Sequence, residues 1–205
     1  IYDAEVIALH ATAMSLGLVR AIAFEREGGK NYGFRCLPKN ALVLGTGQIG
    51  KNVAAKLKGI GIEFIQGVNR DGRAVRGFDQ TWSSENWLQG VPNAGLVIDC
   101  LPAGSILLDD IFFGALPDSA FFVSVGRIEN LVVDAMELAL RTGRLAGAAL
   151  DTKQYFVDGS DDVPNLLLTP HCAAIDEGRS ARLENAFESQ LNRYLTGKTL
   201  QGVVF

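Results

Sequence analysis

The chain has 205 residues, 48% of them hydrophobic, which suffices for one full core with at most a small appendage. Its net charge of -4 argues against the broad basic surface that binds nucleic acid or anionic membranes. Cys36, Cys100 and Cys172 are odd in number and widely spaced, so they predict neither a disulfide framework nor a zinc site and favour a reducing cytoplasm.

The first predicted element is a long helix over residues 3–27, which is apolar on several faces and therefore suits an interface. Its apolar stretch 6–19 is shorter than the roughly 20 residues of a membrane span, so we interpret it as a buried helix. Asp3 and Glu5 precede this stretch, where a signal peptide would carry positive charge. His10 lies inside it, and we expect a packing histidine rather than a catalyst.

Short apolar runs then alternate with helical patterns along most of the chain. The expected strands cover residues 41–44, 62–68, 95–99, 120–125, 145–150 and 166–168. The expected helices cover residues 48–58, 83–88, 106–115, 130–141 and 177–195, with loops over 69–80 and 151–164. This alternation predicts an α/β fold of the Rossmann class, a doubly wound parallel sheet with helices on both faces, over residues 31–175.

A glycine-rich turn follows the first strand, with the sequence Gly45-Thr46-Gly47-Gln48-Ile49-Gly50. In such a turn the first glycine bends the chain, the second lets the backbone approach a pyrophosphate, and the third lets the helix pack close to the strand. Its position between a buried strand and a helix predicts a dinucleotide-binding site, with the phosphates at the helix N-terminus.

Arginines follow the second strand, where a site for NAD normally offers an acidic residue to the ribose. The strand ends at Asn69-Arg70, with Arg73 and Arg76 nearby, and guanidinium groups would pair with the 2′-phosphate of NADP. The sequence thus slightly favours NADP over NAD. A solvated loop whose charges are partly balanced by Asp71 and Asp79 remains an open alternative.

Two further side chains follow strand ends, where ligands bind in open parallel sheets. Arg127 would hold a carboxylate bidentately, and His171 would exchange a proton near neutral pH. Taken singly, a surface salt bridge for Arg127 and a loop histidine for His171 are open alternatives. Asp151 is a candidate acceptor for the nicotinamide carboxamide or ribose, whereas Cys172 lacks the groups that accompany a nucleophile.

Five blocks in order give the chain a family resemblance. They are Gly45–Gly50, Leu101-Pro102, Val125-Gly126-Arg127, the run from Gly143 to Asp151, and the run from Pro164 to His171. Together they resemble the D-isomer-specific 2-hydroxyacid dehydrogenases, which include phosphoglycerate, glycerate, hydroxypyruvate and D-lactate enzymes. The resemblance covers nearly the whole chain.

The resemblance implies a hydride transfer between nicotinamide and C2 of a small 2-hydroxy or 2-oxo acid, with NAD or NADP as cofactor. Arg127 would bind the substrate carboxylate, and His171 would be the general acid/base. It also implies crossover helices in residues 1–30 and 176–205, the first of which helps to form a homodimer. The implied cofactor-binding residues are Gly45, Gly47, Gln48, Ile49, Gly50, Asn69, Arg70, Leu101, Pro102, Val125 and Asp151.

The chain departs from the family pattern in three places. Phe156 stands five residues after Asp151, where the family has a glutamate that orients the histidine, and Asp158 would replace it only if the loop is re-threaded. Ala103-Gly104-Ser105 replaces the Thr-Pro-Glu-Thr stretch. By the resemblance, we expect roughly 90 to 100 further residues of substrate domain that this sequence does not contain, and the start at Ile1 without a methionine suggests a fragment or a trimmed sequence. A catalytically impaired dinucleotide-binding or protein-interaction module is therefore the alternative function.

Overall fold

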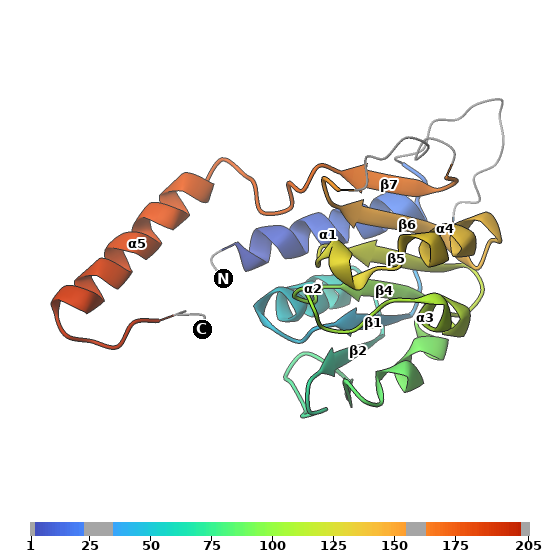
Figure 1. The fold of residues 1–205 in the computed structure, drawn as a ribbon, viewed down its shortest axis with the longest axis horizontal. Helices are drawn as coiled ribbons and strands as arrows, with labels where there is room; N and C mark the ends of the chain where they lie inside the picture. The colour runs from blue at the N-terminus through green and yellow to red at the C-terminus, as the bar shows by residue number, and fades with distance from the viewer. Residues whose placement is uncertain (1–2, 23–34, 155–162, 202–205) are drawn as a thin grey trace.

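A sheet of parallel strands forms the centre of the computed structural model, which describes residues 3–22, 35–154 and 163–201. Within these residues seven strands are hydrogen-bonded in the order β3-β2-β1-β4-β5-β6-β7. Figure 1 labels the strands from β2 through β1, β4, β5 and β6 to β7 in this order across the sheet. The predicted Rossmann-type α/β fold is thus confirmed. The strands are β1 (Asn40–Leu44), β2 (Phe64–Asn69), β3 (Gln80–Ser83), β4 (Leu96–Asp99), β5 (Ala120–Ser124), β6 (Leu145–Asp151) and β7 (Leu166–Thr169).

Helices cover both faces of the sheet because the strands are apolar on both sides. On one face α1 (Ala4–Val19) and α2 (Gln48–Gly59) pack over Ala41 and Val43 of β1. On the other face Leu42 and Leu44 of β1 join a cluster with helices from the second half of the chain. These are α3 (Asp110–Ala115), α4 (Val133–Arg141) and the 3-10 helix η2 (Trp87–Asn93).

The strand order reverses beside β1, which pairs with β2 on one side and with β4 on the other. The connections from β1 to α2 and from β4 to α3 therefore diverge at the carboxyl edge of the sheet. In open parallel sheets this divergence leaves a crevice in which ligands bind. The fold thus sets the candidate site at this edge.

The first helix is shorter than predicted, since α1 ends at Val19 rather than at residue 27. Ala21 takes a left-handed backbone with φ of +50°, and the Ile22 N–H donates to the carbonyl oxygen of Gly17. This is a helix-terminating pattern that composition alone does not reveal. Residues 23–27 lie outside the described part of the chain. None of the described helices is both long and apolar enough to cross a membrane.

Several other predicted boundaries are corrected. The loop 69–80 was expected to lead directly into a helix over 83–88, but the edge strand β3 forms instead, and η2 begins only at Trp87. Asp109 caps α3 by accepting the Phe112 N–H, so that helix starts four residues later than expected. The remaining strands and helices are confirmed to within a few residues at each end.

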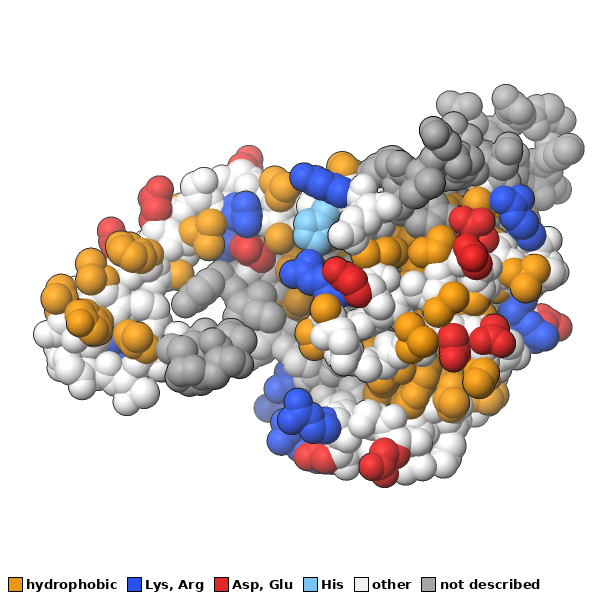
Figure 2. All heavy atoms as spheres, viewed as in Figure 1, with side chains coloured by type: hydrophobic (Ala, Val, Ile, Leu, Met, Phe, Trp, Pro, Cys, Tyr) orange, Lys and Arg blue, Asp and Glu red, His pale blue; other side chains and the backbone are white. Residues whose placement is uncertain are grey.

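The last helix, α5 (Arg179–Leu195), extends away from the sheet in Figure 1 and has no buried residue. One side carries an exposed apolar stripe, seen as orange side chains in Figure 2. Arg182 ties α5 to the start of α1, where its guanidinium donates to Asp3 Oδ1 at 3.0 and 3.2 Å. The stripe consists of Leu183, Phe187, Leu191, Tyr194 and Leu195.

Candidate functional site

The glycine turn lies between β1 and the N-terminus of α2, as the sequence predicted. Gly45 has φ of +95°, in the left-handed region that favours glycine. A Cβ at Gly50 would collide with the carbonyl oxygen of Gly45, so this close approach requires glycine. Gly47 caps α2 and has open space beside it, and the helix N-terminus therefore offers its first N–H groups to an anion such as a phosphate.

The end of β2 carries exposed arginines. Arg70, Arg73 and Arg76 are all exposed, and neither Arg70 nor Arg76 forms an ion pair with another described residue. Asn69 donates from Nδ2 to the carbonyl oxygen of Arg73 at 2.9 Å, while its buried Oδ1 has no partner. Because a buried polar atom normally has a partner, this oxygen indicates a place for a ligand hydroxyl or water.

The acidic residues of the same loop balance these arginines only in part. Asp71 Oδ1 lies 3.9 Å from Arg73 Nε, and both side chains are exposed. Asp79 instead accepts from Lys58 Nζ at 2.8 Å and from the Ile65 N–H at 2.7 Å, and the Lys58 hydrogen bond, helped by that of Ile65, lowers the pKa of Asp79. Asp79, one of the two acidic residues that the sequence offered as partners for the arginines, therefore bonds to α2 and β2 instead.

Two adjoining hollows lie at the carboxyl edge of the sheet. The larger, of about 650 Å³, is lined by the glycine turn, and the smaller has a volume of about 230 Å³. In Figure 2 this part of the surface shows a histidine side chain next to basic side chains. The hollows share Gly126, Arg127, Asp151 and His171, so both side chains singled out for catalysis face one cleft.

Arg127 lies after β5 and directly precedes the 3-10 helix Ile128–Asn130. Its side chain is exposed, and it forms no ion pair with a residue in the described ranges, so the surface salt bridge considered from sequence is not observed there. Asn130 anchors this segment to the loop after β4, because its Nδ2 donates to the carbonyl oxygen of Pro102 at 2.8 Å. Arg127 is thus held at the cleft with its guanidinium available for a carboxylate.

His171 lies in a strained turn after β7. Its φ of +56° is uncommon for a residue with a side chain. Nδ1 lies 3.2 Å from the main-chain oxygen of Asp151. Because a carbonyl oxygen only accepts hydrogen bonds, Nδ1 carries the proton in the neutral ring, which leaves Nε2 available for proton exchange.

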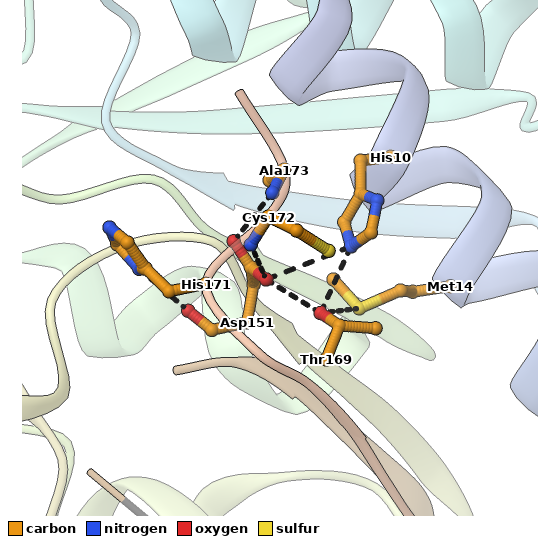
Figure 3. Close-up of polar contacts among 7 residues, drawn as sticks. All are labelled: His10, Met14, Asp151, Thr169, His171, Cys172 and Ala173. Atoms are coloured by element: carbon orange, nitrogen blue, oxygen red, sulfur yellow. Dashed lines mark hydrogen bonds and ion pairs between the residues drawn. The ribbon is translucent and has the colours of Figure 1, made fainter. Parts of the chain in front are cut away.

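The carboxylate of Asp151 holds this turn together (Figure 3). Oδ1 accepts from the Thr169 hydroxyl at 2.7 Å and from the Cys172 N–H at 2.8 Å, and Oδ2 accepts from the Ala173 N–H at 2.9 Å. His10 reaches the same group from α1, with Nε2 3.0 Å from Thr169 Oγ1 and 3.9 Å from Asp151 Oδ1. Since the Thr169 hydroxyl donates to the carboxylate, His10 is the donor to Thr169.

His10, Asp151 and Cys172 place their donor atoms within 4.8 Å of one another, a mixed set of the kind that binds zinc. The Asp151 carboxylate is already occupied by three N–H and O–H donors, however, and His10 is bonded to Thr169. We therefore interpret the group as a hydrogen-bond network. All three cysteines are free thiols.

The loops after β4 and β5 meet over a buried carboxyl group. Asp99 ends β4, and burial raises its pKa to about 6, although hydrogen bonds from the Leu101 N–H and the Ser124 hydroxyl oppose the shift. Burial, and the charge of Asp99, also raise the pKa of the neighbouring Cys100 thiol. Leu101, Pro102 and Val125 line the larger hollow.

Residues 12–173 match the model of the D-isomer specific 2-hydroxyacid dehydrogenase family, NAD binding domain. The chain belongs to this family. The 2-hydroxyacid dehydrogenase resemblance noted in the sequence is thereby confirmed, and the matched residues include the glycine turn, Arg127 and His171.

Individual relatives of this chain are distant. It is 28% identical over 173 residues to glyoxylate/hydroxypyruvate reductase A of Serratia proteamaculans, covering 79% of this chain and 53% of that protein. Among solved structures, the apo form of Rhodotorula graminis D-mandelate dehydrogenase has a TM-score of 0.84 at 21% identity, with 100% of this chain and 67% of that one covered. A D-isomer specific 2-hydroxyacid dehydrogenase from Xanthobacter autotrophicus in complex with NADPH and MES has a TM-score of 0.79 at 22% identity. The match covers 99% of this chain and 88% of that one.

The chain spans about half the length of the curated relatives that it matches. The likeness to the solved structures establishes the fold.

The residues predicted from the sequence include most of those that line this cleft, but not three residues that bond to its lining. Asn69 and Arg70 lie at the end of β2, as expected, but do not line either hollow. Phe156 and Asp158 lie outside the described residues. His10, Thr169 and Asp99 were not predicted to act here, because their partners are far away in sequence and no local motif signals such a pairing.

Proposed function

We propose that the protein is an NAD(P)-dependent 2-hydroxyacid dehydrogenase in which Arg127 binds the substrate carboxylate and His171 is the general acid/base. The observation that supports this proposal most directly is that both side chains face the cleft lined by the glycine turn. An arginine and a histidine beside a dinucleotide site suit a substrate with a hydroxyl group next to a carboxylate.

The cleft fits a dinucleotide cofactor. The collision that a Cβ at Gly50 would cause, and the open space beside Gly47, match a backbone built for close approach of a pyrophosphate. When bound, a nicotinamide dinucleotide supplies or accepts the hydride. The residues proposed to hold it are Gly45, Gly47, Gln48, Ile49, Gly50, Asn69, Arg70, Leu101, Pro102, Val125 and Asp151.

His171 moves the proton in this proposal. Its Nδ1–H is held by the main-chain oxygen of Asp151, so the ring keeps one tautomer, and Nε2 takes the proton from the substrate hydroxyl or returns it to the carbonyl oxygen. A carbonyl partner fixes the tautomer without the charge of a carboxylate. Arg127 keeps the substrate oriented through two parallel hydrogen bonds to its carboxylate.

The test uses the whole protein with NADPH or NADH and with glyoxylate, hydroxypyruvate or pyruvate as substrate. His171→Gln should lower turnover about a hundredfold or more and leave cofactor binding unchanged, because general acid/base groups contribute on that scale. His10→Gln is the matched control at the other histidine of the chain and should retain most activity. Unchanged turnover in His171→Gln would remove the assigned role.

We further propose that the protein prefers NADP to NAD. Arg70 and Arg73 are exposed at the end of β2, where a 2′-phosphate would lie. NADPH should therefore bind more tightly than NADH, and Arg70→Ala with Arg73→Ala should remove most of the difference. Arg193→Ala on α5 is the control. Equal affinities of the unchanged protein for the two cofactors would contradict the preference.

Residues 1–30 and 176–205 are proposed as crossover helices to a substrate domain, and α1 as the surface of a homodimer. The outer side of α1 exposes Leu9 and Leu16, and α5 buries none of its residues. Leu9→Glu with Leu16→Glu should convert a dimer to a monomer in sedimentation, and a monomeric unchanged protein would exclude the dimer. The free thiols support a cytoplasmic location.

A second candidate function is a family member that binds the dinucleotide and a protein partner without turnover. It is supported by Phe156, which occupies the position of the orienting glutamate in the sequence. This candidate predicts cofactor binding and no reduction of any 2-oxo acid. Measurable reduction by the whole protein would exclude it.

A further inference from the structure

Asp99 has no role in the proposed reaction, yet it is a carboxyl group that is only 1% exposed beneath the cleft. None of the lysine, arginine or histidine side chains in the described ranges forms an ion pair with it. Oδ1 accepts from the Leu101 N–H at 2.9 Å, and Oδ2 accepts from the Ser124 hydroxyl at 2.8 Å. Asp99 is thus satisfied by neutral donors.

The two donors belong to two different loops of the site. Leu101 lies in the loop after β4, whereas Ser124 is the last residue of β5, directly opposite Asp99 in the sheet. The Ser124 oxygen in turn accepts from the Gly126 N–H at 3.3 Å, and the Val125 N–H donates to the main-chain oxygen of Asp99 at 3.0 Å. One residue therefore bonds directly or through Ser124 to both loops.

Packing brings the carboxyl group against the same backbone. A Cβ at Gly126 would collide with Asp99 Oδ2, so this loop lies in direct contact with the carboxylate. Leu101 and Pro102 of the first loop, and Gly126 and Arg127 of the second, line the larger hollow. A change in the position of Asp99 would therefore be passed to the cleft.

A buried charge without a cation lowers stability, and an apolar side chain at this sheet position would avoid that cost. Proteins retain such costs mainly where function requires them. We propose that Asp99 is a positioning residue, whose carboxylate holds the loops Leu101-Pro102 and Gly126-Arg127 at the spacing that cofactor binding requires. The nature of the ligand rests on the proposed function, whereas the tie between the loops does not.

Asp99→Asn is the direct test, because it keeps the shape and an oxygen for the Leu101 N–H. Its amide would present N–H groups to Ser124, which then loses the acceptor for its hydroxyl. NADPH affinity at pH 8, measured by fluorescence titration of the intact chain, should fall about tenfold, as expected for the loss of one charge-assisted hydrogen bond. Ser124→Ala should give a similar loss.

Two controls separate positioning from general destabilisation. Asp109→Asn changes a carboxyl group that caps α3 away from the cleft and should bind NADPH like the unchanged protein. The unfolding midpoint of Asp99→Asn at pH 8 should not fall. Unchanged affinity in Asp99→Asn, or a loss matched by an equal loss of stability, would overturn the proposal.

The pH profile of binding gives a further readout. NADPH affinity of the unchanged protein should weaken as the pH falls through the range in which Asp99 gains its proton, and Asp99→Asn should lack this component. The titratable neighbour coupled to Asp99 is the Cys100 thiol, whose raised pKa keeps it protonated throughout. A profile that Asp99→Asn leaves unaltered would contradict the role.

Failure of the cofactor assignment is distinguishable from failure of the tie. If neither NADPH nor NADH binds the unchanged protein, the proposed function is wrong, and amide hydrogen exchange then tests Asp99 directly. Asp99→Asn should speed exchange at Leu101 and Gly126 while leaving β1 and β2 unaffected. Unaltered exchange at these two amides would overturn the positioning role.

Discussion

The protonation of Asp99 makes the folding stability of the chain depend on pH. Its folded pKa of about 6 lies above the ordinary value of 3.8 because burial penalises the charged form. The folded chain therefore holds more protons than the unfolded chain between these two values. Proton binding by Asp99 therefore stabilises the folded chain. This stabilisation is fully present below pH 3.8 and is lost as the pH rises through about 6.

We predict that the stability of Asp99→Asn does not show this decrease with rising pH. Urea unfolding of both proteins at several pH values from 5 to 8 should show the variant gaining on the unchanged protein as the pH rises, by roughly 1–3 kcal/mol in total. A difference independent of pH would show that the carboxyl group titrates alike in the folded and unfolded chains.

His10 supports from a distance the turn that carries His171, the proposed acid/base. Its Nε2–H donates to Thr169, which donates to Asp151, whose main-chain oxygen holds His171. His10→Leu removes the donor, so we predict a fall in turnover of about fivefold, equivalent to roughly 1 kcal/mol, with little change in cofactor affinity. His10→Gln, which offers an N–H again, should restore most of the rate, and equal losses in both variants would argue for packing alone.

Sequence reasoning predicted that Arg127 and His171 lie at the cleft because short motifs at strand ends carry them. It interpreted His10 as a packing residue, since a histidine in an apolar helix has no local partner. The bond from His10 to Thr169 joins residues 159 positions apart, and that from Ser124 to Asp99 joins residues 25 apart. Such pairings follow from strand order and helix placement, which residue spacing does not specify.

At the scale of elements, the buried strands were predictable because their apolar runs are continuous. β3 was missed because Gln80, Thr81, Trp82 and Ser83 form a half-exposed edge strand with no such run. Trp82 is fixed by a tertiary contact, as its Nε1–H donates to Gln66 of β2 at 2.8 Å. Edge strands of this kind depend on the neighbouring strand rather than on their own hydrophobicity.

The junction of β1 and α2 yields a prediction at the same scale. In Gly50→Ala the new methyl group would meet the carbonyl oxygen of Gly45, so α2 must shift away from the strand. We expect a stability loss of roughly 1–3 kcal/mol and a loss of NADPH affinity of more than tenfold. Gly59→Ala is the control at the other end of α2, where nothing lies near the added atom, and it should keep full affinity. An NADPH affinity of Gly50→Ala equal to that of the unchanged protein would show that binding of the cofactor phosphates does not depend on this turn.

At the scale of the whole molecule, the described chain is one cofactor-binding unit with a helix attached at its edge. The core was predictable from the two apolar faces of the strands, but the course of α5 was not, because an amphipathic pattern does not say what covers its apolar side. In the described residues its link to α1 is ionic, through Arg182 and Asp3. Ion pairs near the surface, such as this partly exposed one, weaken with salt.

The bare stripe on α5 has a consequence for handling the chain in solution. Phe187 is 68% exposed and Leu195 is 70% exposed. A row of large exposed apolar side chains on one helix promotes self-association. The purified chain should therefore scatter more light as its concentration and salt content rise. Phe187→Lys should raise its solubility limit, whereas Ser189→Lys, which adds the same charge outside the stripe, should leave the limit nearly unchanged.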